Sequence, residues 1–383
     1  MTVLAQTLVC FLSIIARPPG PENPCGEHPR FLWKESSRGA LYARHSSPAP
    51  PSKQNRWEVE FLLRYIVKRL LMMIPIILAI SFIIFSIISL TPGDPAQLIL
   101  GADADPALLE AKREEWGLND NFLVRYVKYI GGVITGDFGE SYRTGNSVLG
   151  EIASRLPKTM VIALGGIGLS VLVGVPLGLI SAVKQYSFID YFARVLAMLL
   201  TAIPAFWLGL MSLLYVCLKW RLLPATGGES WDGFILPILV LAASATATQT
   251  RTTRSAVLES IRQDYVKMAR AKGVKESRVI FRHVLRNSML PVITIAGMNI
   301  GVQMGGTVVI ENVFAIAGMG NFLVNSVRVK DAPAVVGTLM VVAAFIAIMN
   351  LVVDLIYTVV DPRLKTQYAT AKKRVKRQLR TTT

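Results

Sequence analysis

Side chains able to do chemistry are sparse in this chain of 383 residues, and their spacings match no catalytic or metal centre. The three histidines and three cysteines are scattered, without the paired spacing of a metal site. His283 lies in a basic stretch, where a structural role is expected rather than a catalytic one. The Gly-x-x-x-x-Gly-Lys-Ser/Thr pattern of a phosphate-binding loop does not occur, so the chain is not expected to hydrolyse ATP.

The charged residues that do cluster are mostly basic and lie between Arg251 and Pro291. Apolar residues recur here at steps of three and four, which predicts a helix with one apolar face: Val257, Leu258, Ile261, Tyr265 and Met268. Gly273 then offers a turn, because glycine adopts positive φ without strain, and a second helix is expected after it. A basic loop between apolar spans stays on the cytoplasmic side of a membrane.

The composition places the chain with integral membrane proteins. Hydrophobic residues make up 52% of it and charged residues only 17%. The formal net charge of +16 would suggest nucleic acid in a soluble protein, but here the cations lie in loops and tails between apolar runs. We interpret them as topology signals and contacts to anionic lipid, and expect no nucleic-acid partner.

Six apolar runs are predicted to span the membrane, at residues 70–90, 159–182, 195–218, 234–250, 290–310 and 335–360. Pro204 predicts a kink within the third span, and the glycines of the second span predict close helix packing. The segment between the first two spans is acidic and is expected outside the cell membrane, whereas the basic link at Lys184 and the basic tail are expected inside. Both termini are therefore predicted to be cytoplasmic.

The same reading divides the chain into four parts. Residues 1–60 are expected to be a disordered extension or a misassigned start, and residues 61–155 the first span with the acidic outer segment. Residues 156–360 are expected to hold the other five spans, and residues 361–383 to be a basic cytoplasmic tail. No span centre is expected to carry a charge, with Asp354 near an inner end, which argues against a stand-alone ion-driven transporter.

Several stretches, in order along the chain, resemble the membrane subunits of ABC-type importers, in the dipeptide/oligopeptide/nickel branch. The residues that carry the resemblance are Gly136-Asp137-Phe138-Gly139-Glu140-Ser141, Pro204-Ala205-Phe206-Trp207, Ala269-Arg270-Ala271-Lys272-Gly273, and Gly305-Gly306 with Glu311. Two departures are visible: Lys267-Met268-Ala269 stands where the family has Glu-Ala-Ala, and Ala317 where it usually has proline.

The resemblance implies an all-α protein with six transmembrane helices, which passes several times through the cell inner membrane. It also implies that residues 156–360 form a type I ABC importer transmembrane domain. It implies a permease subunit for di- or oligopeptides, not an enzyme and without a cofactor of its own. The implied partners are a homologous second permease subunit, two ATPase subunits that hold ATP and Mg, and an extracytoplasmic binding protein. Nickel or glutathione as substrate stays open, and so does an ATP-independent secondary transporter.

By resemblance, the ATPase-coupling loop comprises Lys267, Met268, Ala269, Arg270, Ala271, Lys272 and Gly273. The alternative for this loop is a basic surface loop that only sets topology. The candidate path-lining residues are Pro204, Phe206, Gln303, Gly305, Gly306 and Glu311. Packing between helices is an equal alternative for them. If the path interpretation holds, cysteines placed at Met304 or Thr307 are expected to react with an aqueous thiol reagent.

Overall fold

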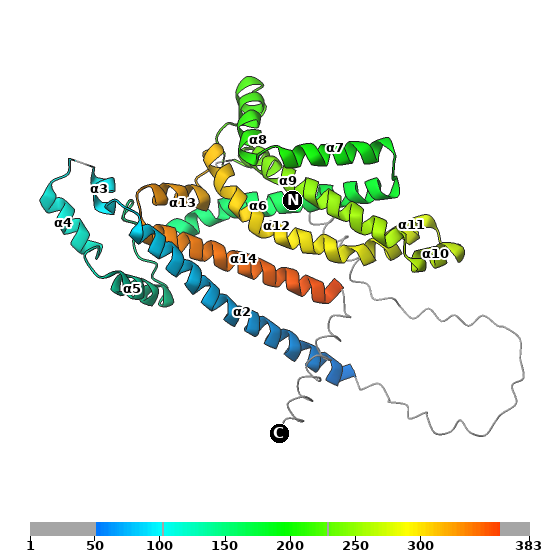
Figure 1. The fold of residues 1–383 in the computed structure, drawn as a ribbon, viewed down its shortest axis with the longest axis horizontal. Coiled ribbons are helices and arrows are strands. Elements are labelled where there is room, and N and C mark those ends of the chain that lie inside the picture. The colour runs from blue at the N-terminus through cyan, green and yellow to red at the C-terminus, as the bar shows by residue number, and fades with distance from the viewer. Residues whose placement is uncertain (1–50, 102, 228–229, 361–383) are drawn as a thin grey trace, which may run out of the picture. The chain divides into compact units, whose positions relative to one another are not determined.

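The computed structural model describes residues 51–101, 103–227 and 230–360 (Figure 1). It divides into two units, residues 1–72 and 73–383. The described part of the first unit is residues 51–72, the beginning of helix α2 (Pro51–Leu90). The predicted extension thus lies outside the described residues up to residue 50, while residues 51–60 are helical. The predicted basic tail, 361–383, also lies outside them.

The described residues are helical apart from loops and one isolated antiparallel bridge, Glu140 with Ser147. After α2, the helices are α3 (Pro95–Leu100), α4 (Pro106–Glu115), α5 (Phe122–Ile134), α6 (Val148–Val183), α7 (Phe188–Ala202), α8 (Ala205–Ser212), the π-helix η1 (Leu213–Lys219), α9 (Asp232–Ile261), α10 (Asp264–Ala271), α11 (Glu276–Arg278), the π-helix η2 (Val279–Leu285), α12 (Arg286–Val313), α13 (Met319–Arg328) and α14 (Ala332–Val360).

Five helical stretches are long and apolar enough to cross a membrane, and the pair of α7 with α8–η1 makes a sixth if it counts as one bent span. The six predicted spans each fall within one of these stretches. The third is more than the expected kink, because its two parts meet at 97°. The cause is Pro204, which keeps Ile203 out of the helical region (ψ 122°) and so ends α7 at Ala202.

Helices α6, α9 and α12 pack side by side at the centre of the second unit (Figure 1). Gly174 and Gly178 of α6 lie against α9, where a Cβ on Gly178 would stand 2.6 Å from the carbonyl oxygen of Thr250. The expected role of small residues in close helix packing is confirmed here. A buried apolar cluster at the other end of the same helices includes Ile162, Val240 and Ile310.

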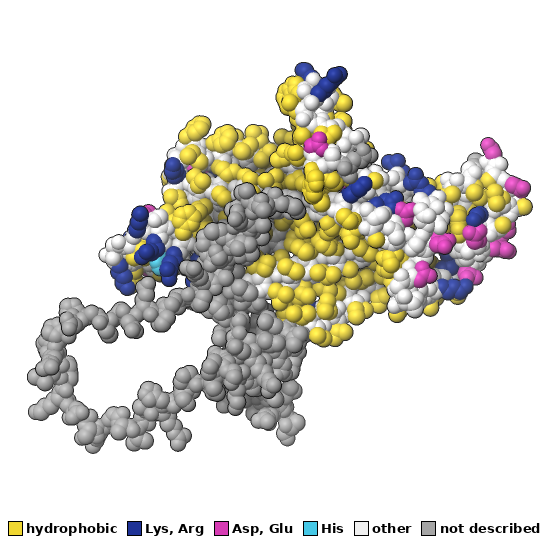
Figure 2. Space-filling view, turned by 180° about the vertical axis from the view of Figure 1, so that it is seen from behind, with side chains coloured by type: hydrophobic (Ala, Val, Ile, Leu, Met, Phe, Trp, Pro, Cys, Tyr) yellow, Lys and Arg dark blue, Asp and Glu magenta, His cyan; other side chains and the backbone are white. Residues whose placement is uncertain are grey.

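The acidic segment after α2 folds into the short helices α3, α4 and α5. Each begins at a side-chain cap, because Asp94, Asp105 and Asn121 accept a hydrogen bond from the backbone N–H two residues on. Aromatic side chains of α5 pack with Phe85 against the start of α14. Acidic side chains gather over this segment, and basic ones over α10 and α11 at the opposite end of the second unit (Figure 2), as the predicted topology requires.

Lys330, in the turn between α13 and α14, ties this outer region together. Its ammonium group donates to three successive carbonyl oxygens at the end of α2: those of Thr91 (2.9 Å), Pro92 and Gly93 (3.0 Å). The backbone of Lys330 has a positive φ of 57°. Residues 237 to 239 positions apart in the chain are thereby joined.

Candidate functional site

The basic stretch folds differently from the single helix and apolar face that its periodicity predicts. Residues 251–261 prolong the span α9, and α10 starts afresh at Asp264 after Gln263, whose backbone is extended (ψ 149°). This break rotates the second helix. Tyr265 and Met268, predicted on the apolar face, are therefore exposed, while Val266 is fully buried.

Helix α10 packs on η2, and this contact decides which predicted coupling residues are accessible. Ala269 is only 9% exposed, whereas Met268, at 61%, takes the outward position. We call the exposed residues of the loop the coupling surface: Lys267, Met268, Arg270, Ala271, Lys272 and Gly273.

Gly273 closes α10 in a Schellman motif. Its N–H donates to the carbonyl of Arg270 (2.9 Å), and the N–H of Val274 donates to the carbonyl of Ala269 (3.2 Å). The φ of Gly273 is +73°, which confirms the turn that the sequence predicts. A bidentate ion pair between Arg270 and Glu276 spans the turn, with its shorter contact 2.6 Å. Its two side chains are about half exposed, so it fixes geometry more than it adds stability.

A buried ion pair that sequence analysis missed joins α7 to α9. Asp190, at the start of α7, has no exposed surface and accepts a bidentate pair from Arg254 of α9, at 2.7 and 2.9 Å. The Ser181 hydroxyl (2.6 Å) and the Tyr186 N–H (3.0 Å) also donate to it. Arg194 approaches to 3.6 Å. The only signal in the sequence was one acid among the basic residues of a short link.

The candidate path residues lie on different faces. Pro204 and Phe206 are exposed around the bend of the third span. Gln303 is buried and donates to the carbonyl of Leu241 (3.2 Å), and a Cβ on Gly306 would meet the Leu241 side chain at 2.8 Å. Gly305 alone of the α12 candidates has open space beside it.

Glu311, the remaining candidate, is fully buried. Its Oε1 accepts from the Thr159 hydroxyl of α6 (2.6 Å), and its Oε2 accepts from the Asn321 N–H (3.0 Å). The Gly320 N–H donates to it as well, while the Met319 N–H donates to Thr159 Oγ1 (2.9 Å). The first N–H groups of α13 are thus capped by two other helices, and the carboxylate lies at the positive end of the helix dipole. Glu311 joins three helices here.

Met304 and Thr307, chosen from the sequence for thiol labelling, are both buried. Between residues 298 and 309 of α12, the exposed positions are instead Met298, Val302, Gly305 and Val309, which recur at steps of three and four and form one face.

Comparison with known proteins explains this combination of apolar spans and basic cytoplasmic turn. Residues 174–366 match the family described as binding-protein-dependent transport system inner membrane component, and residues 62–163 match its N-terminal membrane component. The chain belongs to this family. It is 39% identical over 316 residues to the oligopeptide transport system permease protein AppB of Bacillus subtilis (strain 168), covering 79% of this chain and 99% of AppB.

For two further relatives, the matched region is again 79% of this chain and 99% of the relative. A putative peptide permease protein of Brucella suis is 40% identical over 317 residues, and the glutathione transport system permease protein GsiC of Escherichia coli (strain K12) is 35% identical over 304. A chain of the inward-facing MetNI methionine ABC transporter has a TM-score of 0.48 at 15% identity, covering 56% of this chain and 97% of that chain.

Membership of this family identifies the role of the chain. It is a permease subunit of an ABC importer, multi-pass in the inner membrane, and a transport subunit rather than an enzyme. Its described residues are helical, with five or six stretches long and apolar enough to cross a membrane. Such a subunit works in a complex with an ATPase and a binding protein.

Proposed function

We propose that this permease subunit translocates di- or oligopeptides inward across the cytoplasmic membrane. The observation that carries the proposal is the near-complete coverage of relatives whose names specify oligopeptide or peptide transport, at 39–40% identity. Glutathione is the second candidate, because a glutathione permease is 35–38% identical over 79% of this chain. Both are peptides, so the class of substrate is shared.

The proposed complex contains a homologous second permease subunit, two ATPase subunits that bind ATP and Mg, and an extracytoplasmic binding protein. The coupling surface is proposed to dock on the ATPase: Met268 supplies an exposed apolar contact, and Arg270 and Lys272 supply charge. Two features support this: the turn is exposed at the basic end of the second unit, and its shape is held by the Gly273 turn and the Arg270–Glu276 ion pair. ATP-driven movement of the turn would then reorient packed helices around the path.

The substrate is tested in cells that lack this gene and carry it on a plasmid. Uptake of a labelled dipeptide should return with the plasmid and should be competed by unlabelled di- and oligopeptides. Restored uptake of glutathione or of nickel ions, without dipeptide uptake, would refute the peptide proposal. Uptake that persists after deletion of the ATPase subunits would instead support a stand-alone secondary transporter.

Gly273 tests the coupling surface. We expect Gly273→Val to reduce transport and co-purification of the ATPase, because positive φ strains a β-branched residue by about 1–2 kcal/mol. A Cβ at this position meets no atom within 4 Å, so the effect is conformational rather than a clash inside the chain. Gly273→Asn is the matched control, since asparagine tolerates positive φ, and should keep most transport. Full transport by Gly273→Val with the ATPase bound would show that the turn is incidental.

We further propose that the exposed face of α12 around Gly305 contributes to the path. A cysteine at Val302 or Gly305 should react with a membrane-impermeant thiol reagent, and the reaction should change with ATP and substrate. A cysteine at the buried Met304 should stay unreactive and serves as the control. Reaction at Val302 and Gly305 with lipid-soluble maleimide only would assign this face to lipid.

A further inference from the structure

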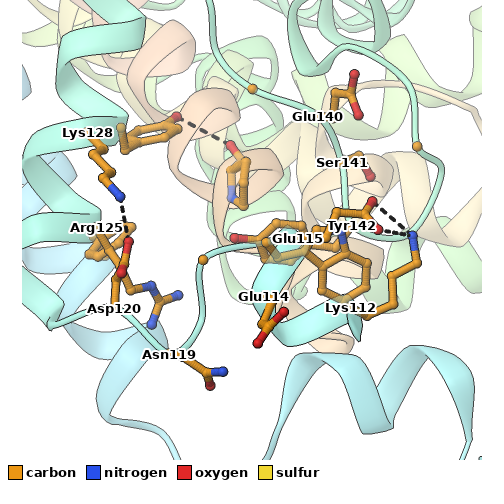
Figure 3. A pocket seen from close by; sticks show the side chains of 17 residues that line it. Lys112, Glu114, Glu115, Asn119, Asp120, Arg125, Lys128, Glu140, Ser141 and Tyr142 are labelled. Atoms are coloured by element: carbon orange, nitrogen blue, oxygen red, sulfur yellow. Dashed lines mark hydrogen bonds and ion pairs between the residues drawn. The ribbon is translucent and has the colours of Figure 1, made fainter. Parts of the chain in front are cut away.

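The acidic outer segment encloses a pocket of about 720 Å³ that no part of the coupling or path proposal uses (Figure 3). It is formed by the end of α4, the turn to α5, α5 itself and the loop 139–145, and its floor includes Phe85 and Pro333. The volume falls within the range of about 300–1,000 Å³ typical of small-molecule sites.

One wall of the pocket is aromatic and held in place. Trp116 and Tyr142 stack with ring centroids 4.5 Å apart. The loop that carries Tyr142 is anchored beside it, because the Ser141 hydroxyl donates to the buried Asp331 at 2.5 Å. Burial raises the pKa of the Tyr142 phenol, so this side chain stays neutral. The wall is therefore ready for an apolar or aromatic group without rearrangement.

The charged side chains of the pocket do not all neutralise one another. Lys112 pairs with Glu115 (2.7 Å) and Lys128 with Asp120 (2.6 Å). Arg125 instead lies over the Phe85 ring and hydrogen-bonds Tyr142.

Three lining groups remain available to a ligand. Within the described ranges no carboxylate pairs with Arg125, and no cation pairs with Glu114 or Glu140. Arg125 and Glu140 lie on opposite sides of the pocket (Figure 3). The Arg125 guanidinium therefore lies across the pocket from the Glu140 carboxylate.

We propose that this pocket binds a short peptide by both of its ends. The α-carboxylate lies on the Arg125 guanidinium, whose planar fork suits a carboxylate. The α-ammonium is held by Glu140, across the pocket from Arg125 (Figure 3), and a side chain packs on Trp116 and Tyr142. The inference rests on the proposed peptide substrate for its biological sense, and it places a peptide site on the permease itself, in the segment before the main transmembrane domain.

The experiment measures binding to the purified full chain in nanodiscs by titration calorimetry. The probe is alanylphenylalanine, used with free ends, N-acetylated, or C-amidated. We expect the free dipeptide to bind and each capped form to bind about tenfold or more weakly, since each cap removes one charge-assisted contact.

Variants assign each end to its partner. Arg125→Gln should weaken the free and acetylated dipeptides and leave the amidated one unchanged. Glu140→Gln should weaken the free and amidated dipeptides and leave the acetylated one unchanged, whereas Glu114→Gln, on the other side of the pocket, should bind like the parent chain. Arg143→Gln and Asp103→Asn remove the same charges at exposed positions outside the pocket, and should bind like the parent chain.

Two results would overturn the proposal. One is equal binding of the free, N-acetylated and C-amidated dipeptides, or no binding, by a parent chain that still supports uptake in cells. The other is protection of a Trp116→Cys thiol by the binding protein but not by peptide, which would make the pocket a protein-docking site. Binding is measured without ATPase, so its failure leaves the transport proposal standing, and failed peptide uptake leaves the binding result readable.

Discussion

Replacing Glu311 by alanine is expected to destabilise the permease severely. The change leaves the Asn321 and Gly320 N–H groups and the Thr159 hydroxyl without their buried acceptor, and removes the anion from the start of α13. Unmade buried hydrogen bonds cost about 1–3 kcal/mol each, so a loss of about 3–5 kcal/mol is expected. The thermal midpoint in detergent and the amount of protein in the membrane should both fall.

Glu311→Gln removes the negative charge but keeps the shape of the side chain, so it separates the two contributions to stability. An amide can replace only one of the two accepting oxygens, so this variant should fall between the parent chain and Glu311→Ala. Asn312→Ala is the control, because Asn312 is the next residue of α12 but is exposed. Normal abundance and thermal midpoint for Glu311→Ala would contradict the role assigned to this carboxylate.

The second large effect is expected at the buried pair Asp190–Arg254. Removing one partner of a buried ion pair costs about 3–5 kcal/mol, because the other charge is left uncompensated. Asp190→Ala should be the worse single change, since it strands both Arg254 and Arg194. Arg254→Ala should cost less, because Arg194, whose Nε and Nη2 are buried without a hydrogen bond, can move toward Asp190.

A double-mutant cycle measures the pair itself. Asp190→Leu combined with Arg254→Met should be more stable than the sum of the single changes, because no lone charge is buried. Arg251→Ala, one turn earlier on α9 and exposed, should leave the thermal midpoint unchanged. Additive effects of the two single changes would show that the residues do not act as a pair. Transport by the double variant would then report whether the contact between α7 and α9 needs charge.

The spans were predictable because hydropathy is a local property of the sequence. Residues 70–90 and 335–360 each lie within one observed helix, α2 and α14, and the glycines of α6 mark a real helix contact. The angle at Pro204 was less predictable, since a proline restricts its own neighbourhood but the packing of α8 sets how far the chain turns. The prediction of which residues of α10 are buried was wrong for a similar reason. The break at Gln263 ends one helix and starts another, so the spacing of apolar residues before it does not continue after it.

The polar contacts of the site were beyond sequence analysis. Asp190 meets a partner 64 residues away, and Glu311 meets Thr159 across 152 residues. The spacing of apolar residues along a sequence shows local structure only, so it cannot predict contacts between residues so far apart in the chain. Glu311 attracted notice as a lone acid near an apolar span, which is a real signal of function or of a buried contact. Only the fold shows that its oxygens are already occupied by α6 and α13.

The Lys330 contact has a consequence for biosynthesis. The carbonyls that it binds lie 237 to 239 residues earlier in the chain. At about 5–20 residues per second, the ribosome needs roughly 12–48 s to make the residues between them. Throughout that interval the loop after the first span cannot make this contact, because Lys330 has not yet been synthesised. A nascent chain arrested before Lys330 therefore lacks this contact at the end of its first helix, although the aromatic side chains of α5 can already pack on Phe85.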